Sequence, residues 1–254
     1  MGILNVTPDS FSDGGEFFAR DVAITHAVEM LDQGADIIDI GGESTRPGAA
    51  PVSEQEELAR VVPVIEGILE ARPDAILSID TTKASVADAA IEAGAHIIND
   101  ISGLGFDPRM PGIAAKHDCP LILMHIRGTP ETMQRDTQYE DLQTELEAYF
   151  RERITLAVDA GVQRAQIVLD PGIGFGKSVE QNYQLVRDLP KLAALGHGIL
   201  LGTSRKSFIG KLSRDEAPKD RVPGSIAAVL AAAAQGVRLF RVHDVAETRQ
   251  ALEV

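Results

Sequence analysis

Short apolar runs rich in β-branched residues alternate along the chain with longer segments of helical periodicity. Four copies of one pattern each join the end of a helical segment to a Gly and then to an apolar run: LDQGADIIDI, IEAGAHIIND, VDAGVQRAQIVLD and AAQGVRLFRVHD. A Gly just after the last helical turn is a common C-terminal cap, and a short apolar run indicates a buried strand. Each copy therefore predicts the helix-to-strand half of a repeating βα unit.

Four further apolar runs lie between these copies and complete a set of predicted strands. They are GILNV, AILSID, CPLILMH and GILLGTS. Strands that alternate with helices form parallel sheets. Together the runs give eight predicted strands. Eight such units in 254 residues predict an α/β fold, a closed (β/α)8 TIM barrel in preference to an open doubly wound sheet. No low-complexity linker divides it, so we expect residues 1–254 to form a single domain.

Three segments carry clear helix signals. Ser53 and Glu56 form the pattern of a capping box, and Pro63 predicts a kink in the helix that follows. Segment 139–160 has the longest amphipathic pattern. Its apolar face carries Leu142, Leu146, Phe150, Ile154 and Ala157. The run 226–234 is apolar on more than one face, which fits either packing on the barrel or a contact with a second subunit.

Composition excludes several classes of partner. The chain has 24 Lys and Arg against 38 Asp and Glu, a net charge of −14, so a broad basic surface for nucleic acid or anionic lipid is not expected. The longest apolar run is too short to cross a membrane. The one cysteine, Cys119, lies in an apolar run and predicts a buried thiol. With no secretory signal at the N-terminus, we expect a cytoplasmic protein.

Polar residues stand at the end of every predicted strand. They are Asn5, Asp39, Asp80, Asn99, His125, Asp170, Ser204, Arg241 and His243. In a (β/α)8 barrel the strand ends meet at one rim, where the active sites of such enzymes lie. Side chains two positions apart share a face of a strand, so several of these groups are expected to point into the barrel together.

The stretch DPGIGFGKS, residues 170–178, has the glycines of a phosphate-binding loop without its spacing. A P-loop requires Gly where Pro171 stands, and the dinucleotide fingerprint fails as well. The better interpretation is a loop whose glycines let the backbone pass close to a flat ligand held by Asp170. Ser178 and Gln181 are expected to cap the next helix, with Lys177 in solvent.

Eight segments, in order and across nearly the whole chain, resemble dihydropteroate synthases of the folate pathway. They are GILNVTPDSFSDGG, DIIDIGGESTRPGA, ILSIDT, IINDISG, MHIRGTPETMQ, DPGIGFGK, GTSRKSFIG and RVHDVAET. This family is a pterin-binding (β/α)8 barrel and the target of sulfonamides. The resemblance implies a transferase that condenses 6-hydroxymethyl-7,8-dihydropterin pyrophosphate with p-aminobenzoate to give 7,8-dihydropteroate and pyrophosphate. It also implies a homodimer and a Mg²⁺ ion.

The resemblance assigns roles to residues of this sequence. The implied pterin-binding residues are Asp80, Asn99, Met124, Asp170 and Lys206, and the implied catalytic residues are Asp80, Lys206 and Asp13. The implied pyrophosphate-binding residues are Asn5, Arg46, Arg241 and His243, with Asn5 placing Mg²⁺. The implied p-aminobenzoate-binding residues are Thr45, Arg46, Pro47, Phe175, Lys206 and Ser207, the last at the start of a helix. Loop 7–15 is expected to close over the site.

Other interpretations stay open at this point. Lys206 has the alternative of a Schiff-base lysine, and His125 that of a general base, although a hydrogen-bonded strand-end histidine is favoured. Asp39 and Glu43 are expected to orient the loop of Arg46. The remaining histidines lack the spacing of a zinc site. A methyltransferase domain that shares the pterin slot, or a non-catalytic paralogue, remains an alternative function. Relatives usually carry a segment before MGILNV, which affects the first strand and Asn5.

Overall fold

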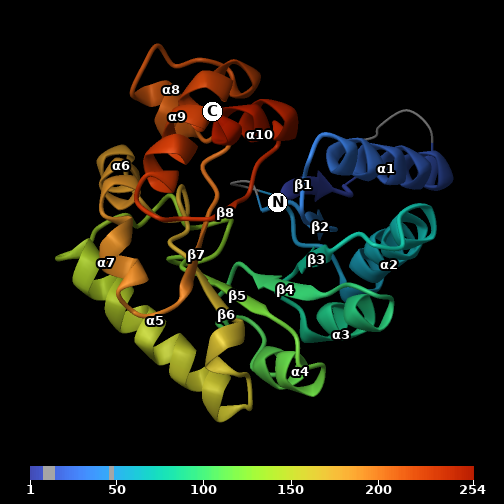
Figure 1. Cartoon of the computed structure of the whole chain (residues 1–254). Helices are drawn as coiled ribbons and strands as arrows, with labels where there is room; N and C mark the ends of the chain where they lie inside the picture. Colours follow the sequence, from blue (N-terminus) through green and yellow to red (C-terminus); the bar gives the residue numbers. More distant parts are fainter. Residues whose placement is uncertain (8–14, 46–48) are drawn as a thin grey trace.

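The computed structural model describes residues 1–7, 15–45 and 49–254, and side chains in these ranges except at 15–19. The described residues form one sheet of eight short strands inside a ring of helices (Figure 1). The strands are β1 Gly2–Asn5, β2 Ile38–Gly41, β3 Leu77–Asp80, β4 Ile97–Asp100, β5 Leu121–Met124, β6 Ile167–Asp170, β7 Gly198–Leu201 and β8 Leu239–Phe240. Each lies in a predicted apolar run or extends one residue beyond it.

The strands are parallel, follow the order β1 to β8, and close into a barrel. Closure comes from backbone hydrogen bonds beyond the end of β8. The N–H of Ile3 donates to the carbonyl of Val242 at 3.0 Å, and the N–H of Val242 donates to the carbonyl of Met1 at 2.9 Å. The closed sheet has no free edge. The predicted (β/α)8 barrel is therefore confirmed.

Helices connect successive strands and cover the outside of the barrel. They are α1 Gly15–Asp32, α2 Glu54–Ala71, α3 Ala84–Glu92, α4 Met110–Lys116, α5 Leu142–Asp159, α6 Val179–Arg187, α7 Leu189–Ala193, α8 Ser207–Lys211, α9 Val222–Ala233 and α10 Val245–Glu253. Among the described residues, two short 3₁₀ helices span Arg164–Gln166 and Pro218–Arg221. The apolar face predicted for segment 139–160 is the buried face of α5.

Two predicted helix starts have different outcomes. Both halves of the capping box at Ser178 and Gln181 are present. At the start of α2 only half of the box forms, because Ser53 accepts from the Glu56 N–H at 3.2 Å while the Glu56 carboxylate pairs with Arg60. The helix α2 continues through Pro63 to its end.

An apolar layer fills the base of the barrel. Met1, Ile122 and Leu200 are buried together there, and four half-buried side chains pack against them: Ile37, Ile97, Val168 and Leu239. Because side chains on one face of a strand recur every two residues, the next layer toward the strand ends is set by the same strands. That layer is polar, and it includes Asp39, Asn99, Asp170 and Arg241.

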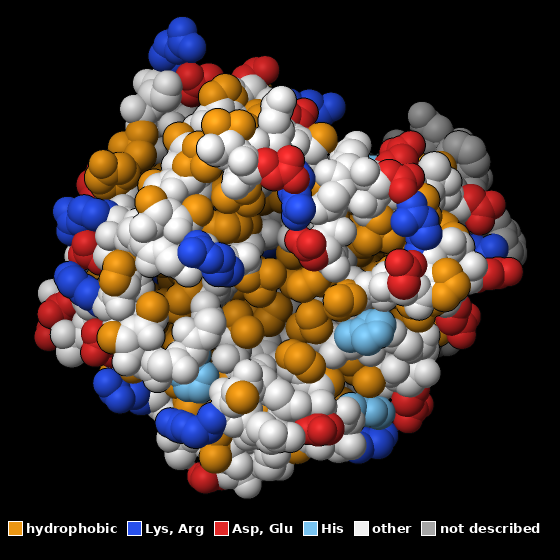
Figure 2. All heavy atoms as spheres, in the orientation of Figure 1, with side chains coloured by type: hydrophobic (Ala, Val, Ile, Leu, Met, Phe, Trp, Pro, Cys, Tyr) orange, Lys and Arg blue, Asp and Glu red, His pale blue; other side chains and the backbone are white. Residues whose placement is uncertain are grey.

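The surface carries charges of both signs, and hydrophobic side chains gather at the centre of the face drawn in Figure 2. Within the described residues, no helix combines the length and the hydrophobicity that a membrane span requires. The thiol of Cys119 is buried as predicted, and burial raises its pKa to about 11.

Candidate active site

The polar layer of the barrel is organised around Arg241, which lies one residue beyond β8. Its Nε donates to Oδ2 of Asp39 at 2.6 Å, and its Nη2 donates to Oδ2 of Asp80 at 2.7 Å. The amide nitrogen of Asn99 donates to the same Asp39 oxygen at 3.0 Å. Strands β2, β3, β4 and β8 are thus joined by one continuous hydrogen-bonded group, Asn99–Asp39–Arg241–Asp80, which we call the floor network.

Two carboxylates of the floor network share a single guanidinium. Asp39 is fully buried and Asp80 is 8% exposed. Burial raises the pKa of the Asp80 carboxyl above its usual range, Arg241 opposes this rise, and the negative charge of Asp39 adds to it. The Asp80 carboxylate therefore sits in a low-dielectric site with its charge only partly balanced.

Asp170 and Lys206 lie beside the floor network. Oδ1 of Asp170 accepts from the Gly172 N–H at 2.7 Å, and burial raises the pKa of Asp170. Burial lowers the pKa of Lys206 to about 8, with the charge of Asp170 acting in the opposite direction and that of Arg241 adding to the decrease. The Lys206 ammonium donates to the carbonyl of Ile173.

Apolar side chains form a wall beside Lys206. Ile101, Met124, Ile126, Met133 and Phe175 make one buried cluster. The ring of Phe175 lies 4.1 Å from the Lys206 ammonium, measured to the ring centroid. We call the region between this wall and the buried polar groups Asn99, Asp170 and Lys206 the slot. Such a combination of apolar and polar groups suits a flat heterocycle whose edge carries hydrogen-bonding groups.

Asn99 offers the slot an unpartnered acceptor. Its Nδ2 donates to Asp39, whereas its Oδ1 is buried and has no hydrogen-bond partner in the part of the chain that the structure describes. A buried polar atom without a partner costs free energy, so such atoms are candidates for ligand contacts. An N–H of a bound ring would satisfy this oxygen.

His243 and Asn5 lie at the same rim, outside the floor network. Oγ of Ser204 lies 3.0 Å from Nδ1 of His243 and accepts from the backbone N–H of that residue at 3.1 Å. Asn5 ends β1 and pairs in register with Gly41. A Cβ added at Gly41 would lie 3.6 Å from Oδ2 of Asp80, so this glycine keeps the space beside the carboxylate open.

The prediction that Lys177 lies in solvent is wrong. The residue is 3% exposed, and its ammonium contacts Nδ1 of His125 at 2.9 Å. It also donates to the carbonyls of Gly172 at 3.0 Å and Phe175 at 2.9 Å. Burial lowers the pKa of Lys177 to about 7, and burial with the nearby Lys177 charge lowers that of His125 to about 2. The Lys177 side chain points into its own loop because the backbone carbonyls of that loop are buried and need hydrogen-bond donors.

His125 is a packed strand-end histidine, as favoured from the sequence. Its ring meets that of Tyr149 edge-on, with the centroids 4.7 Å apart. This places His125 toward α5 and away from the polar layer. It is therefore no part of the group that surrounds Arg241.

Several residues of the expected p-aminobenzoate region can be placed. Thr45 lines a cavity of about 310 Å³ together with Asp80 and Ile101. Ser207 is exposed at the first position of α8, which has only five residues, so a helix dipole contributes little there. Asp13, Arg46 and Pro47 lie outside the described residues.

The two acids expected to orient the loop of Arg46 behave differently. Glu43 accepts from the Val52 N–H at 3.1 Å and pairs with Lys83, which also pairs with the buried Glu57. Glu43 therefore holds the segment that follows β2. Asp39 contacts Arg241 and Asn99, and the Arg46 that it is expected to orient lies outside the described residues. The alternation of strand side chains could have placed Asp39 in the lumen, but its partners could not be foreseen.

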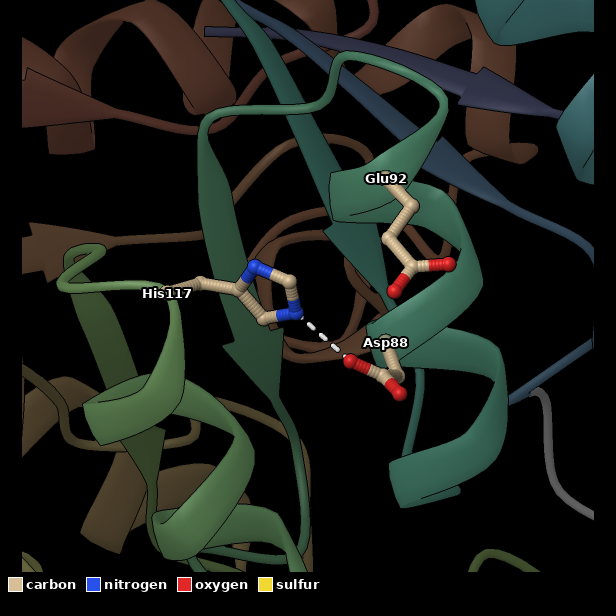
Figure 3. A group of neighbouring side chains, drawn as sticks. All are labelled: Asp88, Glu92 and His117. Carbon is tan, nitrogen blue, oxygen red and sulfur yellow. Dashed lines mark hydrogen bonds and ion pairs between the residues drawn. The ribbon is translucent and has the colours of Figure 1, made fainter.

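One cluster of potential metal ligands lies away from the rim, on α3 and at the end of α4 (Figure 3). Oδ1 of Asp88 lies 2.6 Å from Nε2 of His117, and Glu92 is close by. The Lys116 ammonium pairs with Asp88 at 2.7 Å and with Glu92 at 3.4 Å. A resident side-chain cation thus already balances these carboxylates.

Comparison with known proteins agrees with this geometry. The family model described as "Pterin binding enzyme" matches residues 1–243. A dihydropteroate synthase of Synechocystis sp. is 53% identical over all of this chain and 88% of its own length. A Yersinia pestis dihydropteroate synthase structure with a sulfonamide drug complex has 51% identity and a TM-score of 0.93, over 99% of this chain and 90% of that one.

A Xanthomonas albilineans dihydropteroate synthase solved with 7,8-dihydropteroate has 43% identity and a TM-score of 0.89. That match covers all of this chain and 90% of the other. Sequence, fold and the grouping of polar residues at the rim lead to the same assignment. The chain belongs to the pterin-binding enzymes and, within them, to the dihydropteroate synthase family.

Proposed function

We propose that the barrel rim joins 6-hydroxymethyl-7,8-dihydropterin pyrophosphate to p-aminobenzoate by alkyl transfer to the arylamine, with residues 1–254 acting as one pterin-binding domain. Membership of the dihydropteroate synthase family makes the chain a transferase of folate synthesis. The single observation that best supports the site is the floor network beside the slot of Asp170 and Lys206. It joins buried acids to one guanidinium, and we assign ring binding to the acids beside it and anion binding to the guanidinium.

The pterin ring fits the slot between the polar layer and the apolar wall. We assign the N–H groups of its pyrimidine edge to the Asp170 carboxylate and to Oδ1 of Asn99, which has no hydrogen-bond partner among the described residues. Lys206 donates to the ring carbonyl and a ring nitrogen. Met124 packs on the ring from the cluster that also contains Phe175.

The leaving pyrophosphate carries several negative charges and needs cations. We assign its binding to Arg241 and His243, together with Arg46, which lies outside the described residues. Asn5 fits Mg²⁺, because an amide oxygen is a hard ligand and Mg²⁺ commonly takes only one or two protein ligands beside substrate phosphates. The ion would neutralise charge on the leaving group.

The buried Asp80 carboxylate is assigned to stabilise positive charge on the pterin. Early loss of pyrophosphate leaves a cation spread over the methylene group and the ring, and a fixed anion in a low-dielectric site stabilises such charge. Lys206, whose pKa is lowered to about 8, is close to both ligands in this arrangement. Asp13, outside the described residues, is the third catalytic residue of the proposal.

The attacking amine of p-aminobenzoate approaches from the rim. We assign its ring to Phe175, Thr45 and Pro47, and its carboxylate to Ser207 and Arg46. The Phe175 ring lies against the Lys206 ammonium, which we assign to the pterin. This position supports the assignment of Phe175 to the aromatic ring of the arylamine next to the pterin. Ser207 follows Lys206 directly at the start of α8, which supports its assignment to the rim beside that lysine.

We also propose that the protein is a cytoplasmic homodimer. The helix α9 is almost wholly apolar, and only Ser225, Val229 and Ala232 of it are buried within the chain. Leu230 is 41% exposed on its outer side. A second copy of the chain would cover this face.

The proposal is tested by mixing the purified protein with the pterin pyrophosphate, p-aminobenzoate and Mg²⁺ and following the release of pyrophosphate. We expect turnover that depends on the arylamine and that a sulfonamide inhibits competitively. Turnover of a folate methyl donor with no use of p-aminobenzoate would instead assign a methyltransferase. Binding of pterin without any turnover would indicate a non-catalytic relative.

A further inference from the structure

Asp39 is the only member of the floor network to which the proposed reaction gives no role. It is fully buried on β2, one layer above the apolar base of the barrel. A single oxygen, Oδ2, accepts from both Arg241 and Asn99. We infer that Asp39 is a positioning residue that sets the orientation of the pterin-binding amide and of the anion-binding guanidinium together. The inference depends on the proposed roles of Asn99 and Arg241.

The first argument concerns the Asn99 amide. An ionised carboxylate can only accept hydrogen bonds, so it selects the NH₂ side of an amide that faces it. Nδ2 therefore points to Asp39 at 3.0 Å, and Oδ1 is left as a buried acceptor without a partner. A flipped amide would set two oxygens against each other at the same distance. Asp39 thus determines that Asn99 accepts from a ligand N–H and does not donate to a ligand carbonyl.

The second argument concerns the Arg241 guanidinium. The two carboxylates hold different nitrogens, since Asp39 takes Nε and Asp80 takes Nη2. The guanidinium is planar and rigid, so a bond at Nε fixes the plane in which its outer N–H groups lie. An anion that competes with Asp80 for Nη2 would still meet a guanidinium held by Asp39.

The carboxyl of Asp39 also has a second oxygen that the network leaves unused. Within residues 1–7, 15–45 and 49–254, Oδ1 is buried without a partner, as is Oγ of Ser78, the residue that pairs with Asp39 in register on β3. Because both hydrogen bonds converge on Oδ2, an Asp39→Asn change can keep them through its amide oxygen while removing the charge. Asp39→Ala removes both the charge and the bonds, and Ser78→Ala is a buried control beside them.

The experiment measures the dissociation constants of a hydroxymethylpterin and of pyrophosphate with Mg²⁺ separately, by calorimetry. We expect Asp39→Ala to raise both by about tenfold or more, the effect of losing a buried hydrogen bond to a charged group. Asp39→Asn should keep pterin affinity within about threefold. Ser78→Ala should leave both ligands unaffected.

Coupling separates positioning from a general effect on the fold. In an Asn99→Ala background, Asp39→Ala should add little further loss of pterin binding, and in an Arg241→Ala background it should add little further loss of pyrophosphate binding. Full additivity in both backgrounds would overturn the inference. If Asn99→Ala and Arg241→Ala bind both ligands normally, the proposed site is wrong. This outcome needs no Asp39 variant, so it distinguishes failure of the proposed function from failure of the inference.

A pH profile provides the test if Asp39→Ala does not fold. Charged groups that act on Asp80 come from every side, namely Arg241, Asp39, Glu57 and Asp100, with Lys206 nearby. Removing the Asp39 charge by Asp39→Asn lowers the pKa of Asp80. We therefore expect the acidic limb of kcat/KM to move to lower pH while pterin affinity stays within about threefold. A tenfold loss of pterin affinity in Asp39→Asn, which can keep both hydrogen bonds, would count against the inference.

Discussion

Lys177 illustrates how burial changes the chemistry of a single residue. Its ammonium ends among carbonyl oxygens of the loop after β6 and the imidazole of His125, so it acts as an internal support of that loop. The same loop supplies Ile173 and Phe175, the two groups that hold Lys206. A lysine without catalytic contact thereby helps to fix one that is assigned to the reaction.

The pKa of Lys177 makes stability depend on pH. Its value in the folded protein, about 7, lies below the 10.5 of a free lysine. Between these values the unfolded chain binds more protons, so the free energy of unfolding rises with pH. We expect Lys177→Met to reduce this rise by up to about 1.4 kcal/mol per pH unit from about pH 7 to 8.5.

Urea unfolding at several pH values measures this slope. Lys211→Met, at an exposed position at the end of α8, is the matched control and should leave the slope as it is. An equal slope in Lys177→Met and in the unaltered protein would mean that the buried lysine does not titrate in this range.

Asp170 is expected to control pterin affinity. Its buried carboxylate accepts from the Gly172 N–H and, in the proposed complex, from the pterin edge. Asp170→Asn should weaken pterin binding by about 1 to 3 kcal/mol, the usual loss for a buried hydrogen bond to a charge. Calorimetry with a pterin measures this. The exposed Asp159→Asn on α5 should bind normally, and unchanged affinity in Asp170→Asn would refute the slot.

Asp80 is expected to act on the rate. If it stabilises charge that develops after pyrophosphate departs, Asp80→Asn should lower kcat by roughly a hundredfold and change KM little. The Asn oxygen can still accept from Arg241, so the floor network is retained. Steady-state kinetics with both substrates measures this. A rise in KM with kcat unchanged would show that Asp80 acts in ligand binding and not in the chemical step.

At the scale of elements, the loop between β6 and α6 shows the tightest steric constraint near the site. Gly172 has a φ of +66°, and a Cβ added there would lie 1.9 Å from the carbonyl oxygen of His125. Both the left-handed backbone and the close approach require glycine. Gly172 of DPGIGFGKS is thus required by the contact between two neighbouring strand ends.

Gly172→Ala is therefore expected to destabilise the protein and to displace the loop. Gly196→Ala is a matched control, since its φ is +87° but nothing lies within 4 Å of the added Cβ. The control should cost about 1 to 2 kcal/mol from the left-handed backbone alone. Gly172→Ala should cost more and should also weaken p-aminobenzoate binding through Phe175. Equal losses of stability and normal binding would contradict this account.

At the scale of the whole molecule, an acidic chain brings a few positively charged side chains together where the anionic groups of the substrates are expected. The net charge is −14, yet Arg241 and Lys206 meet at the rim of one closed sheet. Closure through Val242 brings β8 beside β1 and so sets Arg241 against Asp39 of β2. The closed barrel, more than any single helix or strand, brings these side chains together.

The proposed dimer is tested at the same scale. Leu230→Glu places a charge on the outer face of α9, and we expect it to shift the protein from dimer to monomer because burying an unpaired charge is costly. Sedimentation equilibrium measures the mass. Leu156→Glu on α5, where Leu156 is 42% exposed, is the control and should remain dimeric. A protein that is monomeric without substitution would refute the proposal.

The sequence by itself determined the eight strands, their parallel order and the rim residues, because periodicity and strand alternation are local properties. The buried face of α5 and the capping box at Ser178 were also predictable in this way. The tertiary structure decided the contacts between segments that are far apart in the sequence. Examples are the burial of Lys177 and the role of Asp39, whose partners lie 60 and 202 residues away. A polar side chain that can reach either solvent or the interior is buried only where the folded chain provides hydrogen-bond partners for it.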